Sequence, residues 1–199
     1  MGEENYLVDS KLYLKSGVHI GTKFRTKQMA GFIYKTRPDG LSVMNLERIN
    51  ERLRVVANLL AQYDPQQILI VSRRENGWKA VKLFGKATGC VCFPGRYPPG
   101  ILTNPALETF AETKLILVTD AWPDRNAVLD ALKIGIPVIA LCDTNNQING
   151  LDLVLPCNNK GKKSLGLVFY VLAKEFLKAK GIIQKDEDMP INADEFMAE

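Results

Sequence analysis

The sequence has very little histidine, few cysteines and no long apolar run. It contains one histidine and four cysteines, and no two cysteines have the Cys-x-x-Cys spacing. A zinc site therefore lacks its usual ligands, and the thiols are expected to be buried and reduced. No apolar stretch approaches the roughly 20 residues that span a bilayer, and the start of the chain has no signal-peptide pattern. We therefore expect a cytoplasmic protein with no metal centre and no membrane partner.

The motifs of common nucleotide-dependent enzymes are also missing. Residues 156–164 depart from the GxxxxGK(S/T) phosphate-binding loop, because a proline replaces the first glycine and an extra lysine precedes the serine. No GxGxxG, GxSxG or HExxH motif occurs. A nucleotide-binding or phosphotransfer enzyme could still use Asp120, Asp124 and Asp143 as Mg²⁺ ligands, although aspartates after strands are also common in turns and caps. We expect no catalytic residues, no small-molecule substrate and no cofactor.

What the chain does have is positive charge along most of its length. The net charge of +4 combines 26 Lys and Arg with 22 Asp and Glu. Six of these acids fall in residues 186–199, which contain no Lys or Arg, so residues 1–185 have 26 basic and 16 acidic residues, a balance of +10. A basic body of this kind suggests a polyanionic partner such as RNA or DNA, although a solvated surface of mixed charge gives the same count.

Short apolar runs alternate with helical patterns. The runs lie near residues 67–71, 90–93, 115–119, 136–141 and 151–155, and helical periodicity covers about 45–63, 78–88, 124–132 and 164–180. This alternation predicts a parallel sheet covered on both faces, a three-layer α/β/α fold with a flavodoxin-like, doubly wound, five-stranded sheet. Arg-Pro-Asp-Gly at residues 37–40 predicts a turn, so residues 31–36 and 41–44 should form an N-terminal β-hairpin.

Basic, aromatic and amide side chains gather in the N-terminal arm and in the loops that follow the strands. Because the carboxyl ends of parallel strands meet at one edge, these loops should lie together and could bind phosphates and bases. Two alternatives stay open: the arm could be an exposed strand face with core aromatics, and the proline-rich loop at 93–105 could be a structural crossover. The candidate RNA-binding residues are Lys23, Arg25, Lys27, Lys35 and Arg37 in the arm, and Arg73, Arg74, Arg96, Tyr97, Asn158, Asn159, Lys160, Lys162 and Lys163 in the loops.

Three co-linear motifs carry a family resemblance. They are YLKSGVHIGT at residues 13–22, PGRYPPGILTN at 94–104, and ALCDT at 140–144 followed by LPCNNKG at 155–161. These motifs resemble the universal ribosomal protein S2 family in its archaeal and eukaryotic form, the group that includes the laminin-receptor precursor. The chain lacks the long helical insertion of bacterial members and the C-terminal extension of animal members, so laminin binding is not carried over.

The resemblance implies a non-catalytic structural constituent of the small ribosomal subunit, active in translation and in subunit assembly. It implies binding to small-subunit rRNA at the junction of head and body, contacts with neighbouring ribosomal proteins, and no cofactor other than structural Mg²⁺ of the rRNA. We expect one domain over residues 1–183, with a helix and hairpin arm at about 9–44, and an acidic, mobile tail at 184–199. A soluble adaptor that binds only proteins is the remaining alternative, and it would leave the basic body unexplained.

Overall fold

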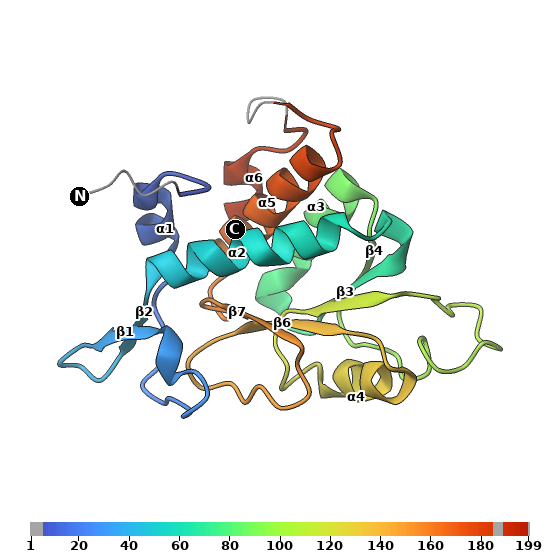
Figure 1. Cartoon of the computed structure of the whole chain (residues 1–199), viewed down its shortest axis with the longest axis horizontal. Coiled ribbons are helices and arrows are strands. Elements are labelled where there is room, and N and C mark those ends of the chain that lie inside the picture. The colour runs from blue at the N-terminus through green and yellow to red at the C-terminus, as the bar shows by residue number, and fades with distance from the viewer. Residues whose placement is uncertain (1–5, 185–188, 199) are drawn as a thin grey trace.

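The computed structural model describes residues 6–184 and 189–198 of the chain. Its centre is a five-stranded parallel sheet in the order β4-β3-β5-β6-β7 (Figure 1). Counted along the chain, these five strands have the order 2-1-3-4-5, which is the flavodoxin-like arrangement, so the predicted fold class is confirmed. The strands are β3 Ile68–Ser72, β4 Val91–Pro94, β5 Leu115–Val118, β6 Val138–Cys142 and β7 Leu153–Pro156.

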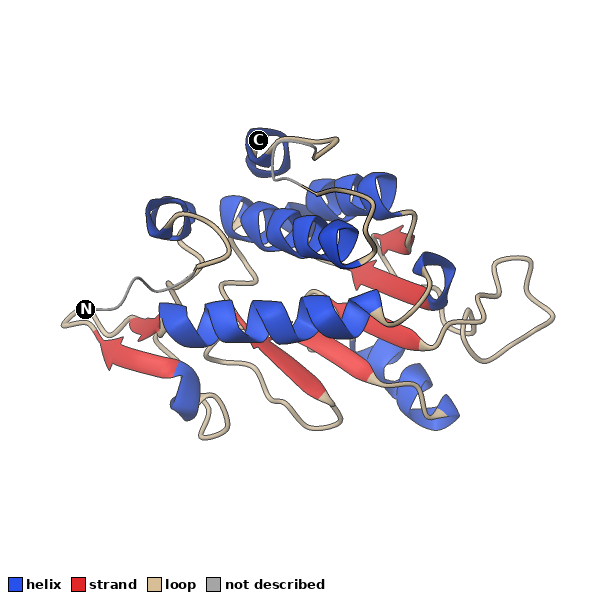
Figure 2. Ribbon diagram, turned by 45° about the horizontal axis from the view of Figure 1, so that its top comes forward, coloured by secondary structure: helices blue, strands red, loops and turns tan. Residues whose placement is uncertain are grey.

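Alternate side chains of each strand enter two separate cores. Ile68 and Ile70 belong to the larger core, whereas Leu69 and Val71 belong to the smaller core on the opposite face. Three helices cover the first face, and α4 (Arg125–Ile134) lies on the second (Figure 2). The sheet is therefore covered unequally. The three helices on the first face are α2 Leu46–Ala61, α3 Glu75–Thr88 and α5 Lys162–Ala179.

The proline-rich loop after β4 adds to the core on the second face. Helix α4 packs on β5 and β6, and Tyr97, Ile101 and Leu102 join the core that contains Leu69 and Val71 of β3. Tyr97 is only 3% exposed, and its hydroxyl donates to Asp130 Oδ2 at 3.3 Å. We predict Tyr97 as an RNA-binding residue of this loop, but its side chain lies in the core because no helix links β4 to β5. The loop is thus a structural crossover.

The N-terminal arm forms a small sheet of its own. It begins with α1 (Ser10–Ser16) and the short helix η1 (Ala30–Phe32). Strands β1 (Ile33–Thr36) and β2 (Ser42–Met44) then pair antiparallel, which confirms the predicted hairpin. Another short helix, η2 (Pro65–Gln67), precedes β3, and within the described ranges no helix has the length and apolarity needed to cross a membrane.

The end of the chain lies on the larger core. Helix α6 (Ala193–Met197) packs on α5, and Phe196 is 1% exposed with its ring 5.8 Å from that of Tyr170. We assigned residues 184–199 to a mobile acidic tail, yet residues 189–198 are seated on the core because Met189 and Phe196 bury apolar side chains. Residues 185–188 and 199 lie outside the described part of the chain, and the domain boundary at 183 stays a prediction.

We expect Gly166→Ala to release α6 from α5. A Cβ at Gly166 would overlap the backbone carbonyl of Phe196. Such overpacking costs about 1–3 kcal/mol, whereas alanine itself would favour α5 by about 1 kcal/mol, so α6 should detach while α5 stays folded. Hydrogen exchange at residues 193–197 should accelerate. Gly31→Ala is the control, because its Cβ would meet nothing within 4 Å, and unchanged exchange in the Gly166 variant would contradict the expectation.

Candidate nucleic-acid interface

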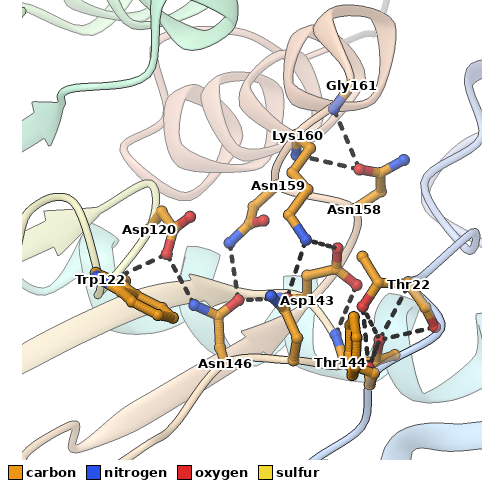
Figure 3. Close-up of polar contacts among 12 residues, drawn as sticks. Thr22, Asp120, Trp122, Asp143, Thr144, Asn146, Asn158, Asn159, Lys160 and Gly161 are labelled. Atoms are coloured by element: carbon orange, nitrogen blue, oxygen red, sulfur yellow. Dashed lines mark hydrogen bonds and ion pairs between the residues drawn. The ribbon is translucent and has the colours of Figure 1, made fainter.

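Buried polar side chains link the loops after β5, β6 and β7 at the carboxyl edge of the sheet (Figure 3). Asn146 is the central residue: its Oδ1 accepts from the Asp143 backbone N–H at 2.8 Å, and its Nδ2 donates to Asp120 Oδ1 at 2.8 Å. Asn159 Nδ2 donates to the same Asn146 oxygen at 3.2 Å and to the Leu141 carbonyl at 3.0 Å. Because these side chains are buried, the bonds replace water and fix the loops relative to one another.

Two of the predicted RNA-binding cations neutralise carboxylates inside this edge. Arg74 forms a two-nitrogen ion pair with Asp120 Oδ2, with Nε at 2.7 Å, and Lys160 Nζ lies 3.0 Å from Asp143 Oδ2. Both aspartates are 1% exposed, and a buried carboxylate is tolerated only with such a partner. Arg74 and Lys160 are therefore structural cations, one-third exposed, whose contact with RNA stays a prediction.

The same ion pairs bear on the alternative of a Mg²⁺ site. Two of its three proposed ligands, Asp120 and Asp143, have a cationic partner. In the part of the chain that the structure describes, no three His, Cys, Asp or Glu side chains are grouped as a metal ion would require. The arrangement of these carboxylates therefore does not favour a phosphotransfer centre.

The loop before α5 is held by its first asparagine. Asn158 Oδ1 accepts from the backbone N–H groups of Lys160 and Gly161, both at 3.1 Å. Its Nδ2 donates to the Gly17 carbonyl at 3.2 Å. The side chains of Asn158 and Asn159 thus hold the loop and the arm in place, and an RNA contact from the buried Asn159 would require this edge to open.

The N-terminal arm is locked onto the loop after β6. The Thr22 backbone N–H donates to Thr144 Oγ1 at 3.0 Å, and the Thr26 N–H donates to the Thr144 carbonyl at 2.9 Å. Gly21 permits this approach, because a Cβ there would lie 2.5 Å from the Thr144 methyl group. The lock places the exposed Lys23 beside the carboxyl edge of the sheet.

The remaining predicted cations point outward. Arg25 donates to Thr36 Oγ1 at 3.0 Å, and Arg37 makes an exposed pair with Asp39 at 3.5 Å, which contributes little. Phe24 and Tyr34 are 80% and 69% exposed, so these aromatics of the arm are not core residues. Within residues 6–184 and 189–198, Lys23, Lys27, Lys35, Arg73, Arg96, Lys162 and Lys163 have no ion-pair partner.

Sequence reasoning missed two residues beside Arg73. Trp122 and Arg125 are exposed and line a hollow of about 510 Å³ together with Arg73 and Arg74. Trp122 lies in the loop after β5, as Arg74 lies in the loop after β3, so the expectation that loops at the carboxyl edge carry binding residues applies to it as well. The residues predicted in these loops from the sequence are charged and amide residues and one aromatic residue, Tyr97, and Trp122 is not among them.

A buried carboxyl group lies under this hollow. Burial raises the pKa of Asp124 to about 7, and the charge of Asp120 adds to the rise, while the Arg73 backbone N–H, 3.1 Å from Oδ1, opposes it. Near neutral pH this group is therefore partly protonated. It also accepts from Thr119 Oγ1 at 3.4 Å, so it joins β5 to the loop after β3.

Comparison with known proteins places the chain beside one family. A family profile described as Ribosomal protein S2 matches residues 13–111 and 107–179. The small ribosomal subunit protein uS2 of Nanoarchaeum equitans is 45% identical over 190 residues, which cover 96% of this chain and 94% of that protein. The protein of the same name from Pyrobaculum calidifontis is 44% identical over 98% of this chain and 97% of its own length. A third, from Thermoplasma volcanium, is 43% identical over 99% of both chains.

We expect Asn146→Ala to lower the free energy of unfolding by about 2–4 kcal/mol. The change leaves the buried Asp143 N–H unpaired, which costs about 1–3 kcal/mol, and it removes one of several hydrogen bonds made by Asp120 and one of the two made by Asn159 Nδ2. Urea denaturation measures the loss. Gln147→Ala, at the exposed neighbouring position, should change stability by less than about 0.5 kcal/mol. Equal stabilities of the two variants would show that Asn146 does not hold the edge together.

We expect the free energy of unfolding of the wild type to fall relative to that of Asp124→Asn as pH rises from about 4 to about 7. The folded state raises the pKa of this carboxyl to about 7, so it binds the proton more tightly than the unfolded state. Stability from this group is therefore greatest at low pH and is lost as the carboxylate forms. The upper bound is about 4 kcal/mol at 1.36 kcal/mol per pKa unit. Urea denaturation of both proteins across this range tests the sign, and a constant difference would contradict it.

Proposed function

The chain belongs to the ribosomal protein S2 family, and we propose that it is a structural, non-catalytic constituent of the small ribosomal subunit. In this role it binds small-subunit rRNA and neighbouring ribosomal proteins at the junction of head and body, and it supports subunit assembly and translation in the cytoplasm. The names of the relatives from Nanoarchaeum equitans and Pyrobaculum calidifontis, both small ribosomal subunit proteins, support the assignment.

One observation carries the RNA-binding part of the proposal. The buried carboxylates at the carboxyl edge, Asp120 and Asp143, are neutralised from within by Arg74 and Lys160. Apart from Arg37, which pairs with Asp39, the outward cations of the arm and loops have no ion-pair partner among the residues that the structure describes. Such unpaired cations release counterions when they meet phosphates, and this release supplies much of the affinity for nucleic acid.

The exposed aromatic residues of the arm add a second support. Phe24 and Tyr34 stand among basic residues, and the ammonium group of Lys35 lies 5.8 Å from the centre of the Tyr34 ring. Rings of this kind stack on unpaired bases of RNA, or fill pockets on a protein neighbour. The arm is thus suited to an interface in an assembled particle, where its apolar rings would be covered.

We expect the cations of the carboxyl edge to hold the protein on the small subunit. A variant with Lys23, Lys27 and Lys163 replaced by glutamine should leave small subunits at lower salt in sucrose-gradient sedimentation of cell lysate. With purified small-subunit rRNA, the slope of log K against log salt should fall by about one unit per lost contact, about three in all.

The matched control is the triple glutamine variant at Lys86, Lys114 and Lys133. These exposed lysines lie at the opposite edge, because Lys86 and Lys133 are in the last turns of α3 and α4 and Lys114 precedes β5. The control removes the same charge and should behave as the wild type does. If the wild type stays at the top of the gradient, the ribosomal assignment fails. If both triple variants shift equally, the carboxyl edge is not the interface.

A further inference from the structure

Two adjoining hollows share the side chains of Trp122 and Arg125. The first, of about 510 Å³, is lined by arginines and lies beside the loop after β3. The second, of about 610 Å³, lies against α4, where Val128, Leu129 and Leu132 give it an apolar wall. A cationic compartment and an apolar compartment therefore meet at one exposed indole, and each has a volume within the range of small-molecule sites.

The first compartment presents two guanidinium groups. The side chains of Arg73 and Arg125 are exposed and have no ion-pair partner in the described ranges. One nitrogen of Arg73 donates to the Pro123 carbonyl at 3.4 Å, which orients its guanidinium beside the hollow and leaves its other donors free. Arg74 is neutralised by Asp120, and Asp124 is buried beneath with its carboxylate toward the Arg73 backbone. The compartment is therefore positive, and guanidinium groups match phosphate geometry.

Trp122, between the two compartments, has an anchored backbone and an exposed indole. Trp122 is 78% exposed, while its backbone N–H donates to Asp120 Oδ1 at 3.1 Å within the buried network (Figure 3). An exposed aromatic face on an anchored backbone is a platform for a nucleobase, and one base stacked on it adds about 1–3 kcal/mol to binding. Asn145, Gln147 and Asn149 also line the second compartment, where amides could meet the edge of a base.

We propose that Trp122 and the two arginines form a site for one unpaired nucleotide of an RNA strand. The base stacks on Trp122 over the apolar compartment, and Arg73 and Arg125 hold the flanking phosphates. This inference rests on the proposed function and specifies a site within it. An acidic peptide is the competing occupant, but it would seat apolar side chains on Leu129 and Leu132 and would need no exposed indole.

Tryptophan fluorescence tests the site directly. The chain has two tryptophans, Trp78 and Trp122, so a Trp78→Phe variant of the full chain leaves Trp122 as the single indole emitter. Titration with a single-stranded oligouridylate of about eight nucleotides should quench this emission. In an anisotropy assay with the same labelled RNA, Trp122→Leu and Arg125→Gln should each weaken binding about ten-fold.

Two matched controls accompany these variants. Trp122→Phe keeps an aromatic face and should retain affinity within a few-fold, and Lys86→Gln removes one positive charge at the far edge and should bind as the wild type does. Because Trp122 and Arg125 are exposed, their variants should fold, which circular dichroism and thermal melting verify.

Three outcomes would overturn the nucleotide site. They are unquenched Trp122 emission, equal affinity of Trp122→Leu and wild type, or stronger quenching by a glutamate-rich peptide containing phenylalanine that is lost in Leu129→Ala. Failure of the site is distinguishable from failure of the proposed function. A protein that sediments with small subunits but binds the oligouridylate independently of Trp122 keeps the ribosomal role and loses this site. A protein that binds the oligouridylate through Trp122 but does not sediment with small subunits keeps this site and loses the ribosomal role.

Discussion

The burial of Asp120 and Asp143 at the carboxyl edge of the sheet is the constraint on which the rest of this surface depends. A buried carboxylate requires a cation and further donors, and here Arg74, Lys160 and Asn146 supply them. Meeting that requirement joins the loops after β3, β5, β6 and β7. Since Thr144, next to Asp143, binds the N-terminal arm, the same chain of contacts also positions the hairpin. Removing one link would leave a charge or an amide unpaired in a site that water does not reach.

The unequal cover of the sheet is a second consequence of the topology. The chain must cross from the edge strand β4 to β5 on the far side of β3, and it does so with an irregular loop of successive turns. A loop without a helix covers a sheet face only if some of its side chains turn inward, which explains why Tyr97 and Ile101 are buried in a loop rich in proline and glycine. Arg96, between them and the strand, remains exposed. A single loop therefore combines core packing with an outward cation.

Sequence reasoning reached the strands, the flavodoxin-like fold class and the hairpin, because apolar runs, helical periodicity and turn residues are local signals. It could not assign Arg74 and Lys160 to ion pairs with buried carboxylates. The local sequence around a basic residue after a strand is the same whether or not a carboxylate faces that residue in the fold. The burial of Phe196 was not predicted, because acidic residues surround it in the sequence and suggest an exposed tail. Trp122 was overlooked because one aromatic residue in a turn has no periodic pattern. Each of these features depends on contacts between distant segments, which local patterns do not encode.

The edge combines a rigid frame with flexible charges, and the two parts would contribute differently to the proposed RNA binding. Asn146, Asn159 and Thr144 hold the loops within the folded chain, so binding need not order them again and loses less conformational entropy. Lysines such as Lys23 and Lys163 have long, unpaired side chains that neutralise phosphates wherever these lie, and their contribution falls as salt rises. The backbone of Trp122 is tied to the frame through Asp120, so its exposed indole is anchored at the edge of the sheet. General affinity would then come from the lysines, and discrimination between paired and unpaired nucleotides from the indole, because only an unpaired base can stack on it.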